Sequence, residues 1–460
     1  MATNLSEELA QALQRARKLT ATGADQAAQQ AYIEVLRQAP THRAALDELG
    51  TLAYAGGFRS AARTAYLQLV RHHPDDKQGH VNLANVFYEE GDPDNAASHY
   101  QAALRIDPEF AEAHQGMARI LSAAGEEAAA AEHWRKGFEG HAVVRKPYRG
   151  SGTAVPLLVL VSARSGNVPS QLWITHRHFA VTALYAEFYD PATPLPPHAL
   201  VVNLIGDADL CAQALQRAQD IVSRSNAPLI NPPARVRVTG RAQNARRLGL
   251  IPGVVAPAIE ALSPAALLAR TGLSYPLLLR RPGFHTGRHF ICVQSQEGLA
   301  PAVETLAADE LLAIQYLDAR GSDGNARKYR VMFIDGELYP LHLAISADWK
   351  VHYFSADMAQ DAAYREEERC FLDDMPGVLG NKAMQALRDI CAAMQLQYAG
   401  IDFALSPDGS VLLFEANATM VVFPPNPDPR WDYRRRAIGT VLEAATQMLL
   451  RHAGSAKDAP

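Results

Sequence analysis

The strongest constraint in this 460-residue sequence is a 34-residue repeat that fills its first third. Five columns of residues recur with this period and share one register. They are Pro40, Pro74 and Pro108; Gly23, Gly57, Gly91 and Gly125; Tyr32, Tyr66, Tyr100 and Trp134; Ala16, Gly50, Ala84 and Ala118; and Ala28, Ala62, Ala96 and Ala130. Glycine allows a tight turn between two helices, small residues let helices approach closely, aromatic residues fill the space between pairs, and proline ends the second helix. The pattern therefore predicts stacked helix pairs.

This pattern resembles the tetratricopeptide repeat family. The resemblance covers residues 9–142 as four repeats that begin near Leu9, Ala44, Gln78 and Ala111. It implies a superhelix whose concave face, formed mostly by the first helix of each pair, binds an extended peptide or protein segment. The residues expected on that face are Asp47, Thr51, Tyr54, Asn85, Tyr88, Gln115 and Arg119. Two alternatives stay open: these are ordinary solvated side chains, or the repeats serve assembly into a homo-oligomer.

Charge separates the repeats from the rest of the chain. Residues 1–140 contain 13 basic and 19 acidic side chains, whereas the other 320 residues contain 31 and 30. A peptide held by the acidic repeats is therefore expected to be neutral or basic. A formal net charge of −5 argues against a dedicated nucleic-acid-binding protein, which usually has a basic face.

Cysteine use and hydropathy predict a cytoplasmic protein that does not enter a membrane. The four cysteines form no CxxC pair, and the first residues lack the apolar core of a signal peptide. No apolar run approaches the roughly 18 residues of a membrane span.

After residue 142 the helical period gives way to short apolar runs between turns. Strands are predicted at 155–161, 179–188, 200–205, 277–279, 329–334, 401–405 and 411–414, and helices at 209–223, 242–248, 264–270 and 382–394. Their alternation indicates an α/β or α+β architecture. The sequence has no GxxxxGK[ST], HExxH or GxSxG motif, and its HxH pair, His176 and His178, is a weak metal signal.

The most informative segment is residues 397–420, which reads as a strand, a Pro-Asp-Gly turn and a second strand. Asp402 lies early in the first strand, and Glu415 and Asn417 lie at the end of the second. Because side chains alternate along a strand, Glu415 and Asn417 share a face, and Asp402 is expected at the same edge. Such oxygen donors suit Mg²⁺. The alternative is that these are surface strand residues or turn contacts.

This segment resembles the metal-binding segment of the ATP-grasp superfamily, and four upstream segments follow in the order of that family. They are residues 227–247, with Arg241; the strand and glycine loop at 275–290; the hinge at Gln315, Tyr316 and Leu317; and residues 328–336. The chain departs from the family in having arginines, such as Arg241 and Arg280, where lysine is common. Its glycine loop is also short.

The resemblance implies a set of site residues. For ATP they are Arg241, Arg280, His285, Thr286, Gly287, Arg288, Gln315, Tyr316, Leu317, Asp318 and Lys328; for Mg²⁺, Asp402, Glu415 and Asn417; and for catalysis, Arg330, His342 and Lys350. The implied chemistry is ATP-dependent activation of a carboxylate as an acyl phosphate, followed by attack of an amine or another nucleophile.

The resemblances together imply an all-α repeat superhelix followed by an α/β (α+β) ATP-grasp fold. We expect repeats over 1–142, a linker over 143–153, a Rossmann-like subdomain over 154–240, nucleotide-binding and catalytic subdomains over 241–450, and a flexible tail over 451–460. A ligase joined to peptide-binding repeats suggests a peptide or protein substrate, for example in the tailoring of a ribosomally made peptide. Two alternatives stay open: a ligase for a small metabolite, with repeats used for assembly, and a nucleotide-binding scaffold without turnover.

Overall fold

The chain forms two compact units, Met1–Val144 and Arg145–Pro460. The computed structural model describes residues 2–284, 287–352, 356–424 and 427–454, with side chains from residue 7 onward.

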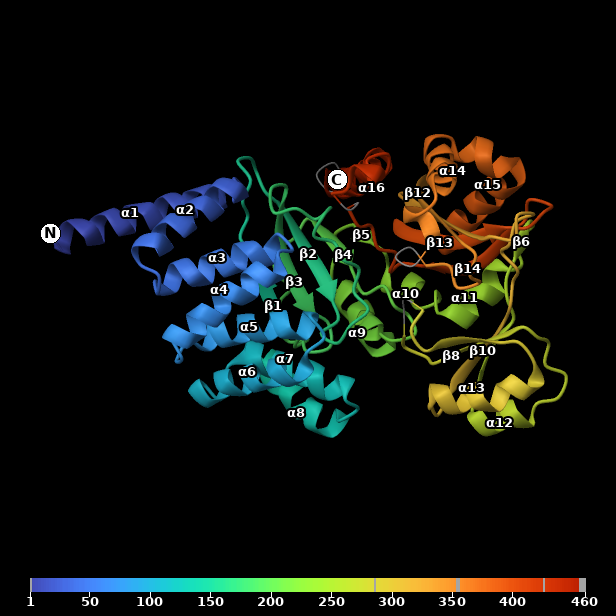
Figure 1. Cartoon of the computed structure of the whole chain (residues 1–460), viewed down its shortest axis with the longest axis horizontal. Helices are drawn as coiled ribbons and strands as arrows, with labels where there is room; N and C mark the ends of the chain where they lie inside the picture. The colour runs from blue at the N-terminus through green and yellow to red at the C-terminus, as the bar shows by residue number, and fades with distance from the viewer. Residues whose placement is uncertain (1, 285–286, 353–355, 425–426, 455–460) are drawn as a thin grey trace. The chain divides into compact units, whose positions relative to one another are not determined.

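The first unit consists of paired helices, which run from blue to cyan in Figure 1. The pairs are α1 (Ala2–Ala21) with α2 (Asp25–Gln38), α3 (Arg43–Ala55) with α4 (Arg59–His72), α5 (Lys77–Glu89) with α6 (Pro93–Ile106), and α7 (Ala111–Ala123) with α8 (Glu127–Phe138). Gly23, Gly57, Gly91 and Gly125 lie between the two helices of each pair with φ from 72° to 82°, a conformation that favours glycine. The prediction of helical repeats is confirmed.

The second unit begins with a parallel sheet. Strands β2 (Val155–Val161), β3 (Phe179–Tyr185), β4 (Leu200–Asn203) and β5 (Leu229–Ile230) pair in the order β3-β2-β4-β5. Helices α9 (Ala212–Val222), α10 (Pro233–Val236) and α11 (Arg241–Leu248) follow the last two strands. Inside the expected linker, Val143–Arg145 form the short strand β1.

A second, antiparallel sheet has the order β7-β10-β8-β9. Its strands are β7 (Ile259–Leu262), β10 (Leu311–Gln315), β8 (Leu277–Arg280) and β9 (Phe290–Val293). The short helix α12 (Pro264–Ala269), the single turn η1 (Gln296–Gly298) and α13 (Leu299–Leu306) accompany it, and Leu267, Leu299 and Val303 join the core of this sheet.

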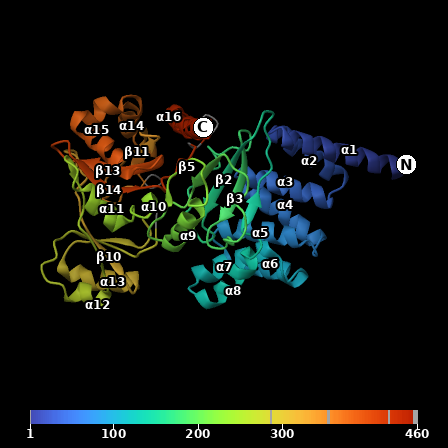
Figure 2. The same cartoon turned by 180° about the vertical axis from the view of Figure 1, so that it is seen from behind.

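The third sheet has the order β12-β11-β13-β14-β6 and is antiparallel except at β6. Its strands are β12 (Glu337–Ser346), β11 (Ala326–Ile334), β13 (Tyr398–Leu405), β14 (Val411–Asn417) and β6 (Val254–Val255). Helices α14 (Ala362–Asp373) and α15 (Met375–Met394) lie together along it, as Figure 2 shows from behind. Tyr329 packs on Phe371 of α14 and stacks on Phe403 of the neighbouring strand. Since side chains alternate along a strand, their neighbours Lys328, Arg330 and Asp402 point to the opposite face.

The long helix α16 (Arg434–Gly454) joins the first and third sheets. Ile438, Met448 and Leu449 share one apolar core with Trp173 and residues of both sheets. The helix includes residues 451–454, which the sequence assigned to a flexible tail. Short single turns η2 (Asp357–Ala359) and η3 (Pro429–Trp431) complete the described elements. The predicted fold class, helical repeats followed by a mixed α/β region, is confirmed. Within the described residues, no helix has both the length and the apolar character needed to cross a membrane.

Candidate functional site

Four polar side chains form a row across the third sheet, on the face opposite α14. The strand register pairs His342 on β12 with Arg330 on β11, Arg330 with Asp402 on β13, and Asp402 with Glu415 on β14. Residues that are far apart in the sequence are thus immediate cross-strand neighbours, a relation that only the complete sheet creates.

A β-bulge lies at each end of this row. Opposite Arg330 and Val331, strand β12 has one extra residue, Leu341; opposite Asp402 and Phe403, strand β14 has one extra residue, Phe414. A bulge re-aims side chains locally. Leu341 and His342 therefore both line the same cavity, as do Phe414 and Glu415, and an apolar side chain flanks the row at each end.

Asp402 is buried in an ion-pair network with two cations. The Arg330 guanidinium donates two hydrogen bonds to the Asp402 carboxylate, at 2.6 Å and 2.8 Å, and the Lys328 ammonium lies 3.1 Å from it. Burial alone would raise the pKa of Asp402, but the charges of Arg330 and Lys328 outweigh burial and hold the pKa well below its usual range. Burial and the nearby charge of Arg330 also hold the pKa of His342 far below its ordinary value, so this buried imidazole is neutral near pH 7.

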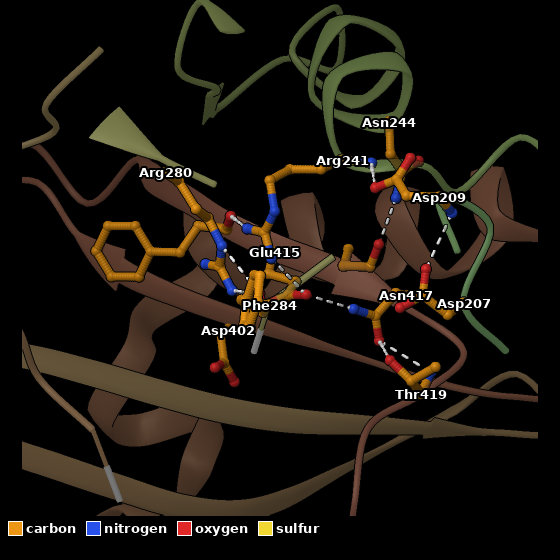
Figure 3. Close-up of polar contacts among 12 residues, drawn as sticks. Asp207, Asp209, Arg241, Asn244, Arg280, Phe284, Asp402, Glu415, Asn417 and Thr419 are labelled. Atoms are coloured by element: carbon orange, nitrogen blue, oxygen red, sulfur yellow. Dashed lines mark hydrogen bonds and ion pairs between the residues drawn. The ribbon is translucent and has the colours of Figure 1, made fainter. Parts of the chain in front are cut away.

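The second carboxylate of the row, Glu415, pairs with Arg241 at the start of α11. The Arg241 Nη2 atom lies 2.8 Å from Glu415 Oε1, and the Asn417 amide donates to the same oxygen at 2.7 Å (Figure 3). The Asn417 carbonyl oxygen accepts from the backbone N–H and the hydroxyl of Thr419. Asn417 therefore directs its NH₂ group toward Glu415.

Arg280, at the end of β8, is a buried cation that donates to the backbone carbonyl of Phe284 (Figure 3). Within the described part of the chain, no carboxylate lies within ion-pair distance of it. Burial, reinforced by the charge of Arg241, lowers the pKa of Arg280 to about 10, so it stays protonated at neutral pH. A buried, charged guanidinium of this kind favours an anionic ligand.

These residues line a cavity of about 640 Å³ within the second unit. Among the described residues, its charged lining consists of five basic side chains, Arg241, Arg280, Lys328, Arg330 and Lys350, and three acidic ones, Asp207, Asp402 and Glu415. The excess of positive charge suits a polyanion. At the Phe414 end, the lining is apolar and comes from the second sheet (Ile259, Leu278, Phe290 and Ile314) and from connecting segments (Pro257, Leu317, Ala319 and Val351). A flat apolar group fits there.

Most of the expected site residues meet in this cavity. Its lining includes Arg241, Arg280, Gly287, Gln315, Tyr316, Leu317, Lys328, Arg330, His342, Lys350, Asp402, Glu415 and Asn417. Asp318 and Arg288 are not part of the lining: Asp318 pairs with Arg320 at 2.6 Å, and the Arg288 guanidinium lies 5.9 Å from the Phe284 ring centre. His285 and Thr286 lie outside the described residues.

The expected hinge and glycine loop are each held at the cavity by close contacts with a neighbouring segment. Gln315 exchanges hydrogen bonds with the Ala258 backbone through both its own backbone N–H and its side-chain oxygen, which fixes the end of β10. Gly287 has φ +72°, and a Cβ atom there would lie 2.5 Å from the Cε atom of Lys350. The loop after β8 and the loop after β12 thus meet where only glycine fits.

Three residues support the site without having been expected from the sequence. The Asp207 carboxylate accepts from the backbone N–H groups of Asp209 and Leu210, both at 2.9 Å, and lines the cavity. The buried Asn244 on α11 donates to the Ala416 carbonyl at 2.5 Å and so ties Arg241's helix to β14. Thr419 holds Asn417, and the sequence Asn-Ala-Thr was the available signal for that contact.

The residues expected to bind a peptide form contacts within and between the helix pairs. Asp47 accepts from Asn82 at 3.0 Å, and Asn85 accepts from Arg119 at 3.0 Å. The other contacts are Thr51 with Tyr66, Tyr54 with Glu89, Gln115 with the Gly137 carbonyl, and the Arg119 guanidinium with the Tyr88 ring. All seven lie on α3, α5 or α7, the first helices of their pairs, and none is fully buried. A role in peptide binding stays a prediction.

Comparison with known proteins identifies the first unit. A family profile for the tetratricopeptide repeat matches residues 48–111 and 81–136. Residues 48–136 are tetratricopeptide repeats. Among solved structures, the repeats are similar to a crystal structure of MamA, with 19% identity over 28% of this chain and 75% of that chain and a TM-score of 0.27. A MamA structure from Desulfovibrio magneticus shows 22% identity over 27% and 71%, with a TM-score of 0.26.

A further similarity includes the α/β region. It is to a RimK domain protein ATP-grasp from Sphaerobacter thermophilus, with 15% identity over 65% of this chain and 99% of that chain and a TM-score of 0.40. No curated protein sequence matches the chain at a significant level.

The donor set at the row has the chemistry that a hard divalent cation needs. Asp402 and Glu415 are cross-strand partners, and Asn417 follows on the same face, so two carboxylates and an amide share one edge. The Asn417 oxygen accepts from Thr419, so the amide must turn before that oxygen can bind a cation. Within the described part of the chain, no group of three His, Cys, Asp or Glu side chains could hold a metal. A cation here would therefore depend on these two carboxylates. It would displace the guanidinium groups of Arg330 and Arg241 from them and would take its other ligands from the bound anion.

Proposed function

We propose that the chain is an ATP-dependent ligase that activates a carboxylate as an acyl phosphate. The observation that carries this proposal is the cavity itself. It combines arginine and lysine side chains, in excess over carboxylates among the described residues, with an apolar slot at one end. A nucleoside triphosphate has the matching composition, since it joins a flat base to a polyanion.

Each end of the nucleotide has suitable partners among the described residues. The base would enter the slot beside Ile314, Leu317 and Phe414, where the backbone at residues 315–317 leaves β10. The phosphates would lie against Arg241 and Arg280. Arginine suits this role because its planar fork binds phosphate oxygens in pairs.

The reaction that we propose has two steps. A carboxylate oxygen of the substrate attacks the γ-phosphorus, a new P–O bond forms, and the bond to the ADP oxygen breaks. The nucleophile, an amine in the simplest case, then attacks the acyl carbon, and phosphate leaves. Lys328 and Arg330 would stabilise the charge that develops on the phosphoryl and acyl oxygens. Mg²⁺ held by Asp402, Glu415 and Asn417 would neutralise phosphate charge when bound.

We further propose that the substrate is a peptide or protein segment bound by the repeats. The support is the repeat family itself, whose repeats bind protein segments, and the half-exposed polar face of α3, α5 and α7. A ligase for a small metabolite, with repeats used for assembly, is the second candidate.

Calorimetric titration with MgATP, followed by an assay of ADP release, tests this function. We expect MgATP to bind the wild-type protein and Glu415→Gln to abolish ADP formation while preserving the fold. Normal ADP release by Glu415→Gln would overturn the metal assignment, and absence of MgATP binding would overturn the function.

A second comparison tests the role of the repeats. Arg119→Ala removes contacts to Asn85 and Tyr88 on the face of α5 and α7. If the repeats bind the substrate, this variant raises KM for a peptide substrate and leaves the affinity for MgATP unchanged. A matched change at the exposed Arg37 on α2, which pairs with Glu34 one helical turn away, serves as the control.

A further inference from the structure

The two ends of the charged row open onto different apolar surroundings. At the β14 end, Phe414 packs with Leu317 and Val351. At the β12 end, Leu341 belongs to a separate cluster that includes Met420 and Ile438. Strands β12 and β14 are three strand spacings apart, or about 14 Å. The cavity therefore has two apolar ends, which we call the Phe414 end and the Leu341 end, on either side of the charges.

The Leu341 end is lined mainly by uncharged side chains, although Asp207, whose carboxylate accepts from the backbone N–H groups of Asp209 and Leu210, lies beside Gly166. The loop after β2, the segment after β14 and helix α16 supply Ser165, Gly166, Asn167, Pro169, Thr419, Met420, Val421 and Ile438. The Asn167 amide bonds to the Ser162 backbone through both its oxygen and its nitrogen, at 2.7 Å each. The Thr419 hydroxyl donates to Asn417. These two polar side chains already serve the fold, so the surface offered to a ligand is apolar apart from the Ser165 hydroxyl and the His342 imidazole.

Among the cations of the third sheet, Arg330 lies closest to this end. It is the register partner of His342, and the next residue along β11, Val331, belongs to the core. A carboxylate lying against Arg330 would place the rest of its molecule toward Leu341. A charged group there would lose most of its hydration and find only the His342 imidazole and the Ser165 hydroxyl nearby among the described residues, whereas an apolar group would be stabilised by burial.

We propose that the Leu341 end binds an apolar group attached to the carboxylate that the enzyme activates. The substrate class is then a carboxylic acid with a branched aliphatic or similar side chain beside the reacting carboxyl, such as the C-terminal leucine of a peptide. This inference rests on the proposed function and deepens it, because it assigns the second end of the same cavity.

The test uses two acids of nearly equal size, N-acetyl-leucine and N-acetyl-asparagine, with MgATP and hydroxylamine. Hydroxylamine attacks the acyl carbon of an acyl phosphate, the C–O bond to phosphate breaks, a proton passes to water, and a hydroxamate forms that can be measured. We expect kcat/KM for N-acetyl-leucine to exceed that for N-acetyl-asparagine by at least about tenfold. Equal use of both acids, or preference for asparagine, would overturn the proposal.

Variants at the two ends give a matched comparison. Met420→Ala and Leu341→Ala enlarge the Leu341 end, so we expect both to raise KM for N-acetyl-leucine several-fold and to leave the calorimetric affinity for MgATP unchanged. Phe414→Ala, at the other end, should weaken MgATP binding and keep the preference for leucine. If Leu341→Ala weakens MgATP binding as Phe414→Ala does, the assignment of the two ends is wrong.

A binding measurement keeps this inference separate from the proposed function. Saturation-transfer NMR with the wild-type full chain should show N-acetyl-leucine in contact with the protein, with or without nucleotide, and Met420→Ala should weaken that signal. A protein that binds MgATP but not N-acetyl-leucine refutes only this inference. A protein that binds N-acetyl-leucine but not MgATP supports the apolar site and refutes the ligase function.

Discussion

The repeats and the α/β region use polar side chains in opposite ways. In the repeats, polar contacts join the first helices of successive pairs, such as Asp47 with Asn82 and Asn85 with Arg119, each about one repeat apart in the sequence. In the α/β region, charges from segments up to 174 residues apart meet at one row, as Arg241 and Glu415 do. The first arrangement distributes stability along the chain, and the second concentrates it at a single place.

The largest effect is expected where charges are concentrated. Asp402→Ala would leave Arg330 and Lys328 in a buried site without their carboxylate, and removal of one partner from such a network costs about 3 kcal/mol. Urea unfolding, combined with hydrogen exchange resolved by region, should show the loss in the α/β region alone. Asp408→Ala, in the turn of the same hairpin, removes an exposed pair with Lys382 and the hydrogen bonds from Ser406 and Ser410, and should cost about 1 kcal/mol. Equal losses for the two variants would contradict the concentration of stability at the row.

A steric test addresses the repeats. Gly116 lies against the Tyr100 ring, and a Cβ atom there would be 2.1 Å from the ring carbon Cζ. Gly116→Ala should therefore destabilise the repeats by about 2 kcal/mol, since overpacking outweighs the gain in helix propensity. Thermal unfolding followed by helical circular dichroism measures the loss. Because the cavity lies within the second unit, the affinity for MgATP should stay unchanged.

A third prediction concerns pH and two pairs of histidines that repeat with the 34-residue period. The Nδ1 atoms of His80 and His99 are 3.0 Å apart, and those of His114 and His133 are 2.8 Å apart. Burial, together with the partner histidine, lowers the pKa of His99 and of His133. Nearby charged side chains are Asp107 and Glu109, which face His114, and Glu132 and Lys136, which face His133.

Because these pKa values are lowered on folding, the unfolded chain binds protons first as the pH falls. The contribution to stability is complete above the unfolded histidine pKa of about 6.5 and is lost progressively as the pH falls below it. The free energy of unfolding of the repeats should therefore decrease between pH 7 and pH 5, by less than the effect of Gly116→Ala. His99→Asn with His133→Asn should flatten this dependence; an unchanged profile in the double variant would remove the histidines as its source.

The smallest effect is expected at a glycine with open space around it. Gly439 lies in α16, and a Cβ atom there would have no neighbour within 4 Å. Gly439→Ala should stabilise the α/β region by about 1 kcal/mol through helix propensity. Comparison with Gly116→Ala tests whether local packing decides if a glycine-to-alanine substitution raises or lowers the free energy of unfolding.

The repeats and the α/β region also differ in how much of them could be predicted from the sequence. The repeats could be predicted because each column of the period reports a contact between neighbours in the chain. In the α/β region, Asp402, Glu415 and Asn417 could be placed together because one hairpin joins them. The ion pairs of Arg330 with Asp402 and of Arg241 with Glu415 could not, since they depend on strand order.

Other features escaped prediction for physical reasons. The bulges at Leu341 and Phe414 leave no pattern in a single strand, because they are defined only by the register of the partner. Strand β12 has a proline, Pro340, in its interior, which argues against a strand. Helix α16 begins with three consecutive arginines, so its start reads as a solvated segment in the sequence. In the structure, Arg434 is instead buried against Glu368.

The position of α16 has a consequence for protein synthesis. Its residues 434–454 share a core with the first and third sheets, which are encoded from residue 155 onward. The repeats use only contacts between near neighbours and can fold while the ribosome is still translating. The α/β region must wait with an open apolar core until α16 has left the exit tunnel, so during translation it is the part of the chain that most needs protection by chaperones.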